Sequence, residues 1–333
     1  MLTARGDLGR VRLVQDNRGA DGAGLGIVVV NYGSSGLLAV NLAAASAACP
    51  EATVVVVDNP TTADERTRIT DLAQQSGWHL VTEDVNVGFG TGMNHGVAAA
   101  RRAGATRFLL LNPDARIDAH AVGVLGDAVI ADPMLLVSPV VHRPDGGVWF
   151  AGADLYLRTG LMRSRRRREP GAEIREWLSG ACLMVSADLW DACGGFSDTY
   201  FLYWEDVDLS ARVLEAGGRL EVREDAVAVH DEGATHRTGP EQLGKSPTYY
   251  YFNTRNRLQY AVDHLDRATV ARWLLLAPWC AWQILLQGGR RQLLHPAAPV
   301  GAVARGTLAG ARIAAAHLLG RAVRLQAAGD PRR

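Results

Sequence analysis

Three acidic residues, Glu205, Asp206 and Asp208, lie close together behind a run of aromatic residues and could take part in proton transfer. The stretch YFLYWEDVDLSAR, residues 200–212, places them at the start of a predicted helix. Acidic side chains in a first helical turn complement the helix dipole, so a purely structural role is one interpretation. The aromatic residues before them favour a second, because a carboxylate beside apolar surface is a candidate general base.

A fourth carboxylate, Asp114, follows directly on an apolar run. In LLLNPDARID the leucines predict a buried strand, and Asn112 and Asp114 come just behind it. Two other apolar runs end in the same way, GIVVV at Asn31 and TVVVV at Asp58 and Asn59. A carboxylate at such a strand end often accepts N–H groups from a base or a ribose, and a helix N-cap or turn is the alternative for Asp58.

A glycine-rich stretch, NVGFGTGMNHG at residues 86–96, follows a further predicted strand and leads into a helix. A dinucleotide-binding fingerprint would need a glycine where the chain has Met93, so that interpretation fails. A turn of this kind can still expose backbone N–H groups to an anion or let a flat base approach closely, although a structural turn is the alternative. Asn86, Gly88 and Asn94 are the residues of this stretch that could border a ligand.

Strands and helices alternate through the first part of the chain. Apolar runs predict strands over 26–33, 53–60, 78–82 and 107–114, with helices before residue 49 and over 63–77 and 92–103. This alternation is typical of βαβ units, so we expect an α/β fold with a doubly wound, mostly parallel sheet. Because ligands bind beyond the carboxyl ends of such strands, the polar residues that follow them are expected to converge on one edge.

The second part of the chain has a less regular pattern. Short strands are expected over 148–157 and 177–186, followed by the helix that begins near Glu205 and a strand that ends at His230. A lone histidine at such a point is more often structural than a ligand. From Pro247 the chain is expected to be helical to about residue 327.

Two stretches allow either a structural role or contact with another surface. RSRRRR, residues 163–168, predicts a solvated loop or a contact with phosphate or anionic lipid. RWLLLAPWCAWQILLQ, residues 272–287, is short for a spanning helix and is interrupted by a proline. It predicts either a helix packed on the main domain or a helix at a membrane surface, with Trp273, Trp279 and Trp282 at the headgroup level.

Composition limits the classes of protein to consider. The 333 residues are 48% hydrophobic, which is ample for one large α/β domain with an appendage. Thirty-five basic and thirty-five acidic residues cancel, which argues against a nucleic-acid partner. The four cysteines lack metal-ligand spacing and the polar N-terminus lacks an apolar signal region, so we expect a cytoplasmic protein with a flexible segment over residues 1–24.

Taken in order, the motifs resemble the inverting glycosyltransferases of family 2, which have the GT-A fold. The matching elements are VVVNYG, VVVDN, NVGFGTGMNHGV, LLLNPDA, WLSGACLMV, GGFSDTYFLYWEDVDLSAR, His230 and YYYFNTRNR. The NPD form, together with the WLSG and FLYWEDVDL stretches, is most similar to the bacterial rhamnosyltransferase branch. The usual D-x-D of the family is here Asn112-Pro113-Asp114, so one carboxylate stands where a pair is usual.

The resemblance implies roles for individual residues. The residues implied to contact the nucleotide-sugar donor are Asn31, Asp58, Asn59, Asn86, Gly88, Asn94, Asn112, Asp114, Ser179, Gly180, Arg255 and Arg257. Asp114 would hold Mg²⁺ or Mn²⁺ against the donor diphosphate with His230 nearby, because a hard cation offsets charge on the departing phosphate. Asp206, from the Glu205–Asp206 pair, would be the general base. Trp177 and Trp204 would stack on acceptor or donor rings.

The implied activity is transfer of L-rhamnose from dTDP-L-rhamnose to a cell-surface glycan or a lipid-linked precursor, at the inner face of the plasma membrane. A UDP-hexose or UDP-N-acetylhexosamine donor is one alternative, and a catalytically inactive nucleotide-sugar-binding protein is another. We expect a GT-A domain over residues 25–245, with a nucleotide-sugar half over 25–140 and an acceptor half over 141–245. A helical extension over 246–333 would follow.

Overall fold

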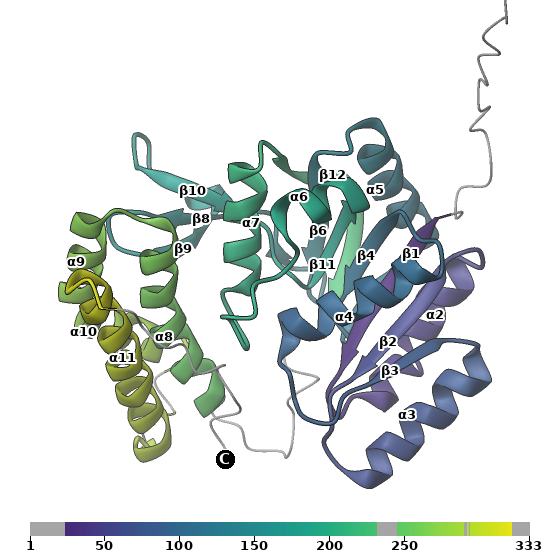
Figure 1. Cartoon of the computed structure of the whole chain (residues 1–333), viewed down its shortest axis with the longest axis horizontal. Coiled ribbons are helices and arrows are strands. Elements are labelled where there is room, and N and C mark those ends of the chain that lie inside the picture. Colours follow the sequence, from purple (N-terminus) through teal and green to yellow (C-terminus); the bar gives the residue numbers. More distant parts are fainter. Residues whose placement is uncertain (1–23, 232–244, 290–291, 293, 322–333) are drawn as a thin grey trace, which may run out of the picture.

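The computed structural model describes residues 24–231, 245–289, 292 and 294–321. The predicted flexible segment over 1–24 lies outside these residues apart from Gly24, and so does the end of the predicted helical region beyond residue 321. The described residues form an α/β sheet with helices on both faces, flanked at one end by a small second sheet and a group of C-terminal helices (Figure 1).

Within the described residues, the central sheet has nine strands in the order β3-β2-β1-β4-β11-β6-β12-β5, with β7 paired to β6. Its strands are β1 Leu25–Asn31, β2 Thr53–Asp58, β3 His79–Thr82, β4 Arg107–Leu111, β5 Ala115–Ile117, β6 Leu135–His142, β7 Val148–Phe150, β11 Cys182–Ser186 and β12 Arg219–His230. β1 to β4 are parallel, and β11 joins antiparallel to β4. The predicted mostly parallel sheet is thus confirmed.

Alternate side chains of β1 enter two separate cores. Ile27 and Val29 pack beneath one layer of helices, whereas Val28 and Val30 pack beneath the other. The first layer consists of α1 Ser35–Leu38, α2 Asn41–Ala48, α3 Ala63–Ser76 and α5 Ala119–Ala131. The second layer consists of α4 Phe89–Arg102, α6 Ala187–Cys193 and α7 Glu205–Glu215. A strand buried on both faces explains the continuous β-branched sequence.

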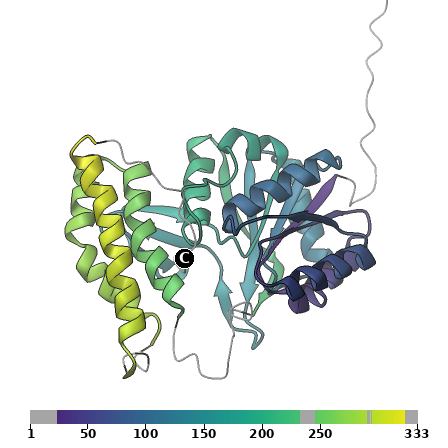
Figure 2. The same ribbon diagram turned by 60° about the horizontal axis from the view of Figure 1, so that its bottom comes forward.

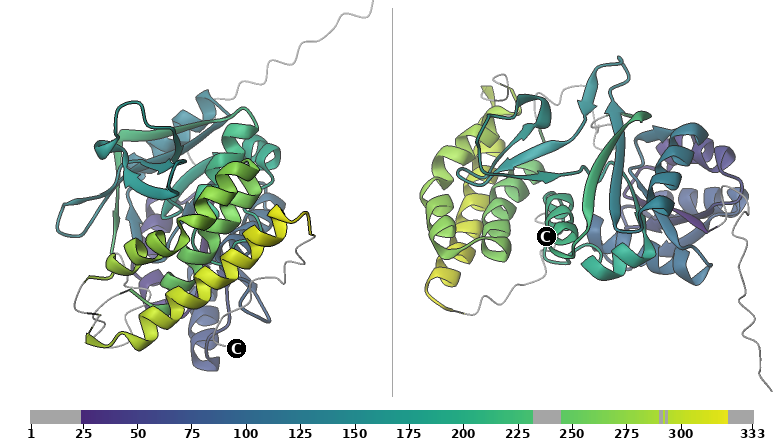
Figure 3. Two further views of the ribbon diagram at one scale, coloured as in Figure 1. Left: turned by 90° about the vertical axis from the view of Figure 1, so that its left-hand side faces the viewer. Right: turned by 90° about the horizontal axis from the view of Figure 1, so that it is seen from above.

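A second, smaller sheet and the C-terminal helices share a third core. The sheet consists of β8 Ala153–Tyr156, β9 Leu161–Ser164 and β10 Ile174–Trp177, and the helices are α8 Pro247–His264, α9 Arg267–Leu275, α10 Ala277–Leu286 and α11 Ala297–Leu318. Leu155 of the sheet packs with Tyr260 of α8 and Trp273 of α9. Figure 2 shows α8 and α11 side by side, and Figure 3 shows these helices at the end of the molecule opposite α3.

The stretch over 272–287 folds as parts of two short helices. Trp273 is fully buried and its ring packs on Tyr260, so the alternative that placed Trp273 at a headgroup level is wrong for this residue. Trp279 and Trp282 are 45% and 50% exposed. Within the described part of the chain, no single helix is both long and apolar enough to cross a bilayer. Helices α9 and α10 taken together have the required length and composition, with a 59° bend between them.

Gly88 allows the start of α4 to lie against the segment that precedes α7. Its φ of 86° falls where residues with a side chain are strained, and Asn86 Oδ1 accepts its N–H at 3.0 Å. A Cβ atom at Gly88 would lie 2.3 Å from the carbonyl oxygen of Phe201. The same oxygen accepts the Phe89 N–H at 3.0 Å. Glycine is therefore required where these two segments meet.

We expect Gly88→Ala to lower the free energy of unfolding by about 2 kcal/mol or more, from backbone strain together with the clash at Phe201. The matched control is Gly123→Ala in α5, where an added Cβ meets nothing within 4 Å. That variant should be neutral or stabilised by up to about 1 kcal/mol, because alanine favours a helix interior. Chemical denaturation measures both, and equal stabilities of the two variants would contradict the required close approach.

Candidate active site

Two residues predicted for the base pocket lie side by side at the carboxyl ends of β1 and β2. The parallel register pairs Asn31 with Asp58, and the Asn31 amide donates a 2.7 Å hydrogen bond to the Asp58 carboxylate. The second Asp58 oxygen lies 2.5 Å from Nε of Arg66. Burial raises the pKa of Asp58, while the Asn31 hydrogen bond and the Arg66 charge act in the opposite direction. The contact of this pair with a nucleotide base stays a prediction.

Two of the predicted donor contacts, Asn59 and Asn94, hold backbone segments in place. The Asn59 amide donates to Gly88 O at 3.1 Å and accepts from Val87 N at 3.0 Å. The Asn94 amide makes the same kind of double contact with the backbone of Phe196, at 2.8 and 2.9 Å. Both side chains thus position the glycine-rich loop and α4, and their contact with a nucleoside stays a prediction.

The loop after β4 is fixed from two sides. The carbonyl of Ala181 accepts the Asn112 N–H at 3.0 Å, and the amide of Asn41 in α2 donates to the carbonyl of Pro113 at 2.9 Å. Asn41 was not among the predicted site residues, and no sequence signal distinguishes it from other helical positions. Oδ1 of Asn112 is buried without a hydrogen-bond partner among the described residues, so this oxygen is available to a ligand.

His230 lies against Asp114 because β12 pairs with β5. The register places His230 opposite Ala115, and Nε2 of His230 is 3.0 Å from Oδ1 of Asp114. The ring of Trp149 packs on the imidazole at a centroid distance of 4.4 Å. Two residues predicted as metal ligands from distant parts of the sequence are thus neighbours in space.

The side chains at this point carry atoms of the kinds that bind a divalent cation. Mg²⁺ and Mn²⁺ bind carboxylate and amide oxygens, and Mn²⁺ also binds imidazole. Asp114, His230 and the unpartnered oxygen of Asn112 supply such atoms. No cluster of three or more His, Cys, Asp or Glu residues that could hold an ion occurs in the part of the chain that the structure describes. An ion here would therefore need oxygen ligands from a bound molecule.

Asp206 is linked to this loop through the residues that precede β11. Its Oδ2 accepts the Gly180 N–H at 3.0 Å, and its Oδ1 accepts the Val207 N–H at 2.9 Å. The next residue, Ala181, accepts the N–H of Asn112. The predicted base and the predicted metal-binding loop therefore contact neighbouring residues of one short backbone segment. Of the predicted residues, Gly180 has the clearest positioning role.

The two carboxyl groups at the start of α7 have different proton affinities. Burial raises the pKa of Asp206 to about 6, although hydrogen bonds from Gly180 and Val207 favour its ionised form. Burial and the neighbouring Asp206 charge raise the pKa of Glu205 well above its usual range, and Oε2 of Glu205 has no hydrogen-bond partner among the residues that the structure describes. Asp206 is thus the member of the pair that more readily loses its proton, which suits it to the predicted role of base.

The turn before Glu205 has a strained backbone that α8 holds in place. Tyr203 and Trp204 have φ angles of 63° and 74°, which cost on the order of 1–3 kcal/mol each for residues with large side chains. The amide of Asn256, fully buried in α8, donates to the carbonyl oxygens of Leu202 at 3.0 Å and Tyr203 at 2.7 Å. Asn256 lies inside the YYYFNTRNR motif, but the sequence signal favoured the arginines on either side of it.

Those two arginines make intramolecular contacts in the described structure. Arg255 is buried and donates to the carbonyl of Thr199 at 3.5 Å, and burial lowers its pKa. Arg257 donates to the carbonyl oxygens of Thr159 and Trp273, and burial lowers its pKa to about 10. Both side chains thus join α8 to neighbouring segments, and their contact with a diphosphate stays a prediction.

The tryptophans predicted to stack on sugar rings pack within the protein. Trp204 is buried against Tyr260 and Trp273, whereas Trp177 is partly buried with its ring 5.4 Å from that of Phe150. Ser179 is buried just before Gly180, beside the contact with Asp206. A role for any of the three in sugar binding stays a prediction.

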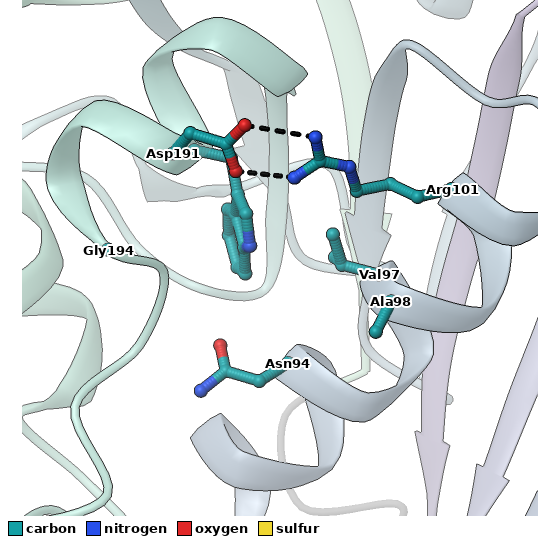
Figure 4. Close-up of a pocket in the computed structure, with 7 residues that line it drawn as sticks. Asn94, Val97, Ala98, Arg101, Asp191 and Gly194 are labelled. Atoms are coloured by element: carbon teal, nitrogen blue, oxygen red, sulfur yellow. Dashed lines mark hydrogen bonds and ion pairs between the residues drawn. The ribbon is translucent and has the colours of Figure 1, made fainter.

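A surface pocket lies between α4 and α6, apart from these residues (Figure 4). Its walls include Val97, Trp190 and the ion pair between Arg101 and Asp191. Asn94 is the one predicted site residue in its lining. The pocket borders the last turns of α4, whereas the first turn of that helix meets the polar strand ends, so we assign the chemistry to the strand ends.

Comparisons with other proteins reveal relatives of modest identity. No protein-family model matches the chain. The N-acetylglucosaminyl-diphospho-decaprenol L-rhamnosyltransferase of Mycobacterium tuberculosis strain H37Rv is 28% identical over 242 residues, which cover 65% of this chain and 78% of the relative. The low-salt glycan biosynthesis hexosyltransferase Agl10 of Haloferax volcanii is 20% identical over 275 residues, which cover 79% of this chain and 85% of the relative.

Solved structures show the same fold. The mannosyltransferase PcManGT from Pyrobaculum calidifontis, in complex with GDP-Man and Mn²⁺, has a TM-score of 0.52 and 18% identity, with 89% of this chain and 87% of that chain covered. GalNAc-T7 with UDP, GalNAc and Mn²⁺ has a TM-score of 0.50 and 12% identity, with 84% and 54% covered. This chain thus spans about half of the GalNAc-T7 chain.

The fold, the polar strand ends and the relatives together define the class of protein. The chain is a glycosyltransferase with the GT-A fold. The predicted enzyme class and the predicted fold are confirmed, and similarity to a rhamnosyltransferase accompanies them.

We expect kcat/KM to fall as the pH drops through about 6, because Asp206 must be ionised to accept a proton and burial raises its pKa to that value. Asp206→Asn should lower kcat by about 100-fold or more. The control is Asp191→Asn, an exposed carboxylate of the Figure 4 pocket, which should leave turnover and its pH profile unchanged. Unaltered turnover in Asp206→Asn, with circular dichroism matching the parent protein, would show that another group is the base.

We expect Asn256→Ala to lower kcat by about 10- to 100-fold with little change in the KM for the donor, because the turn that precedes Asp206 loses both amide contacts. The acid limb of the pH profile should also shift, since the environment of Asp206 changes. Asn253→Ala is the matched control, because Asn253 lies in the same helix and donates to Tyr249 of its own helix. Equal effects of the two substitutions would assign Asn256 a general role in stability.

Proposed function

We propose that the chain transfers L-rhamnose from dTDP-L-rhamnose to a hydroxyl group of a cell-surface glycan or lipid-linked precursor, with inversion at the anomeric carbon. The observation that supports this proposal is that Asp206 and the loop with Asp114 contact neighbouring residues, Gly180 and Ala181, while His230 lies against Asp114. The mycobacterial relative is named as a rhamnosyltransferase that acts on a polyprenol-linked sugar, which supports the same choice of sugar and acceptor.

The donor would lie along the polar ends of the strands. Asp58, held by Asn31, would accept the N–H of the pyrimidine base, as the resemblance implies. Asp114 and His230, with the unpartnered oxygen of Asn112, would hold Mg²⁺ or Mn²⁺ beside the diphosphate. When bound, the ion would offset the negative charge that develops on the leaving diphosphate.

Asp206 would act on the acceptor. Its ionised carboxylate takes the proton of the acceptor hydroxyl as the oxygen bonds to the anomeric carbon, while the bond from that carbon to the diphosphate oxygen breaks. The Gly180 N–H holds one carboxylate oxygen in a fixed direction at 3.0 Å. The second oxygen accepts the local N–H of Val207, and a carboxylate oxygen has a further lone pair for the incoming proton. Burial and the Asp206 charge raise the pKa of Glu205, which disfavours a second negative charge at this point.

The test is a panel of nucleotide sugars with released diphosphate as the readout, measured with and without Mn²⁺. We expect release from dTDP-rhamnose in the presence of the ion, and at least about 100-fold less with Asp114→Ala. Calorimetric titration of dTDP should show the same loss of ion-dependent binding in Asp114→Ala, while circular dichroism stays that of the parent protein. Release from UDP-hexose or UDP-N-acetylhexosamine alone would replace the rhamnosyl assignment, and binding without release from any donor would indicate an inactive binding protein.

A further inference from the structure

The last three helices, α9, α10 and α11, contain arginines but no acidic residues. Over residues 267–329 the sequence contains eight arginines and no aspartate or glutamate, although the two charges balance over the whole chain. Five of these arginines are described and all are exposed: Arg267, Arg272, Arg305, Arg312 and Arg321. None of the five forms an ion pair with another described residue. Helices α9 and α11 therefore carry a net positive charge on their exposed sides.

The same helices expose large apolar side chains. Seven of the twelve large apolar side chains that are exposed among the described residues lie between Leu275 and Leu319. Leu275 is 82% exposed at the bend between α9 and α10, and Trp279 and Trp282 follow on one side of α10. The opposite side of α10, with Cys280 and Ile284, is buried against the other helices. Both exposed tryptophans of this group thus point away from the core.

Basic and apolar side chains share the exposed sides of two helices. In α9, Arg272 and Leu275 are three residues apart, so they lie on the same side. In α11, Arg305, Leu308 and Arg312 recur at intervals of three and four residues and are all exposed. Figures 1 and 3 show α9, α10 and α11 together at one end of the molecule, with the small sheet beside them.

We propose that this end of the molecule docks on an anionic phospholipid surface, with Leu275, Trp279 and Trp282 at the headgroup level and the arginines on the lipid phosphates. Tryptophan prefers the boundary between apolar and aqueous phases, and each nearby arginine adds attraction to an anionic leaflet. α9 and α10 have 9 and 10 residues, whereas a spanning helix needs about 20. The two helices and the bend between them would therefore lie in the plane of the membrane interface.

The charge of this surface favours lipid over a second copy of the chain. Two such surfaces facing each other would bring arginines together with no carboxylate from the same helices to pair with them. The small sheet next to these helices adds Arg166 and Arg167, which are exposed and form no ion pair with a described residue. A phospholipid leaflet supplies both an apolar layer and phosphate charge, as this mixed surface requires.

The test is cosedimentation of the full chain with vesicles of phosphatidylcholine alone and with vesicles in which about a third of the lipid is phosphatidylglycerol. We expect binding to the anionic vesicles that weakens with added salt. The double variant Trp279→Ser/Trp282→Ser should weaken this binding by about tenfold or more, since two large apolar side chains no longer leave water. Arg272→Gln/Arg312→Gln should reduce the preference for anionic vesicles.

The matched control is Ile130→Ser, which removes a 60% exposed apolar side chain from α5 in the central domain and should bind as the parent protein does. All the altered side chains are exposed, so circular dichroism and melting temperature should stay unchanged. Equal binding of the tryptophan variant and the parent, or no binding to anionic vesicles, would overturn the proposal. So would a dimer in sedimentation velocity that the tryptophan substitutions dissociate. Because the assay needs neither donor nor acceptor, its outcome is independent of the proposed rhamnosyl transfer.

Discussion

The hydrogen bond from the Gly180 N–H to the Asp206 carboxylate sets the geometry on which the rest of the site depends. Gly180 precedes β11, which pairs with β4, so the position of Asp206 follows from the order of the central sheet. The neighbouring Ala181 contacts Asn112 at the end of β4. The backbone of residues 180–181 is thus hydrogen-bonded both to the carboxylate on α7 and to the polar loop after β4. A shift of this segment would move both.

Holding Asp206 in this position requires a backbone that is unfavourable by itself. Two successive large residues, Tyr203 and Trp204, have left-handed conformations, and such strain persists only where surrounding contacts exceed its cost. The contacts come from two elements. The Asn256 amide in α8 donates to two carbonyl oxygens of this turn, and the Phe89 N–H of α4 donates to the carbonyl oxygen of Phe201. The turn is thus fixed between the glycine-rich loop and α8.

The sequence predicted the features that depend on local patterns and on the general geometry of parallel sheets. The β-branched runs at β1 and β2 indicated doubly covered strands, and the rule for strand ends placed Asn31 beside Asp58. The same patterns could not predict which polar side chains form hydrogen bonds with the backbone of distant segments. Asn59 and Asn94 satisfy carbonyl and N–H groups of distant segments, and those partners are defined only by the tertiary fold.

For the same physical reason, sequence patterns favoured Arg255 and Arg257 over Asn256. Arginines next to a glycosyltransferase motif suggest contact with a diphosphate, whereas a buried amide has no distinctive pattern. In the fold, Asn256 binds the strained turn before α7, and Arg257 of the same helix donates to Trp273 of α9. Helix α8 thus packs against both the turn that precedes Asp206 and the helices with the exposed tryptophans. The turn before Asp206 and helix α9 are therefore both held by contacts with the same helix, α8.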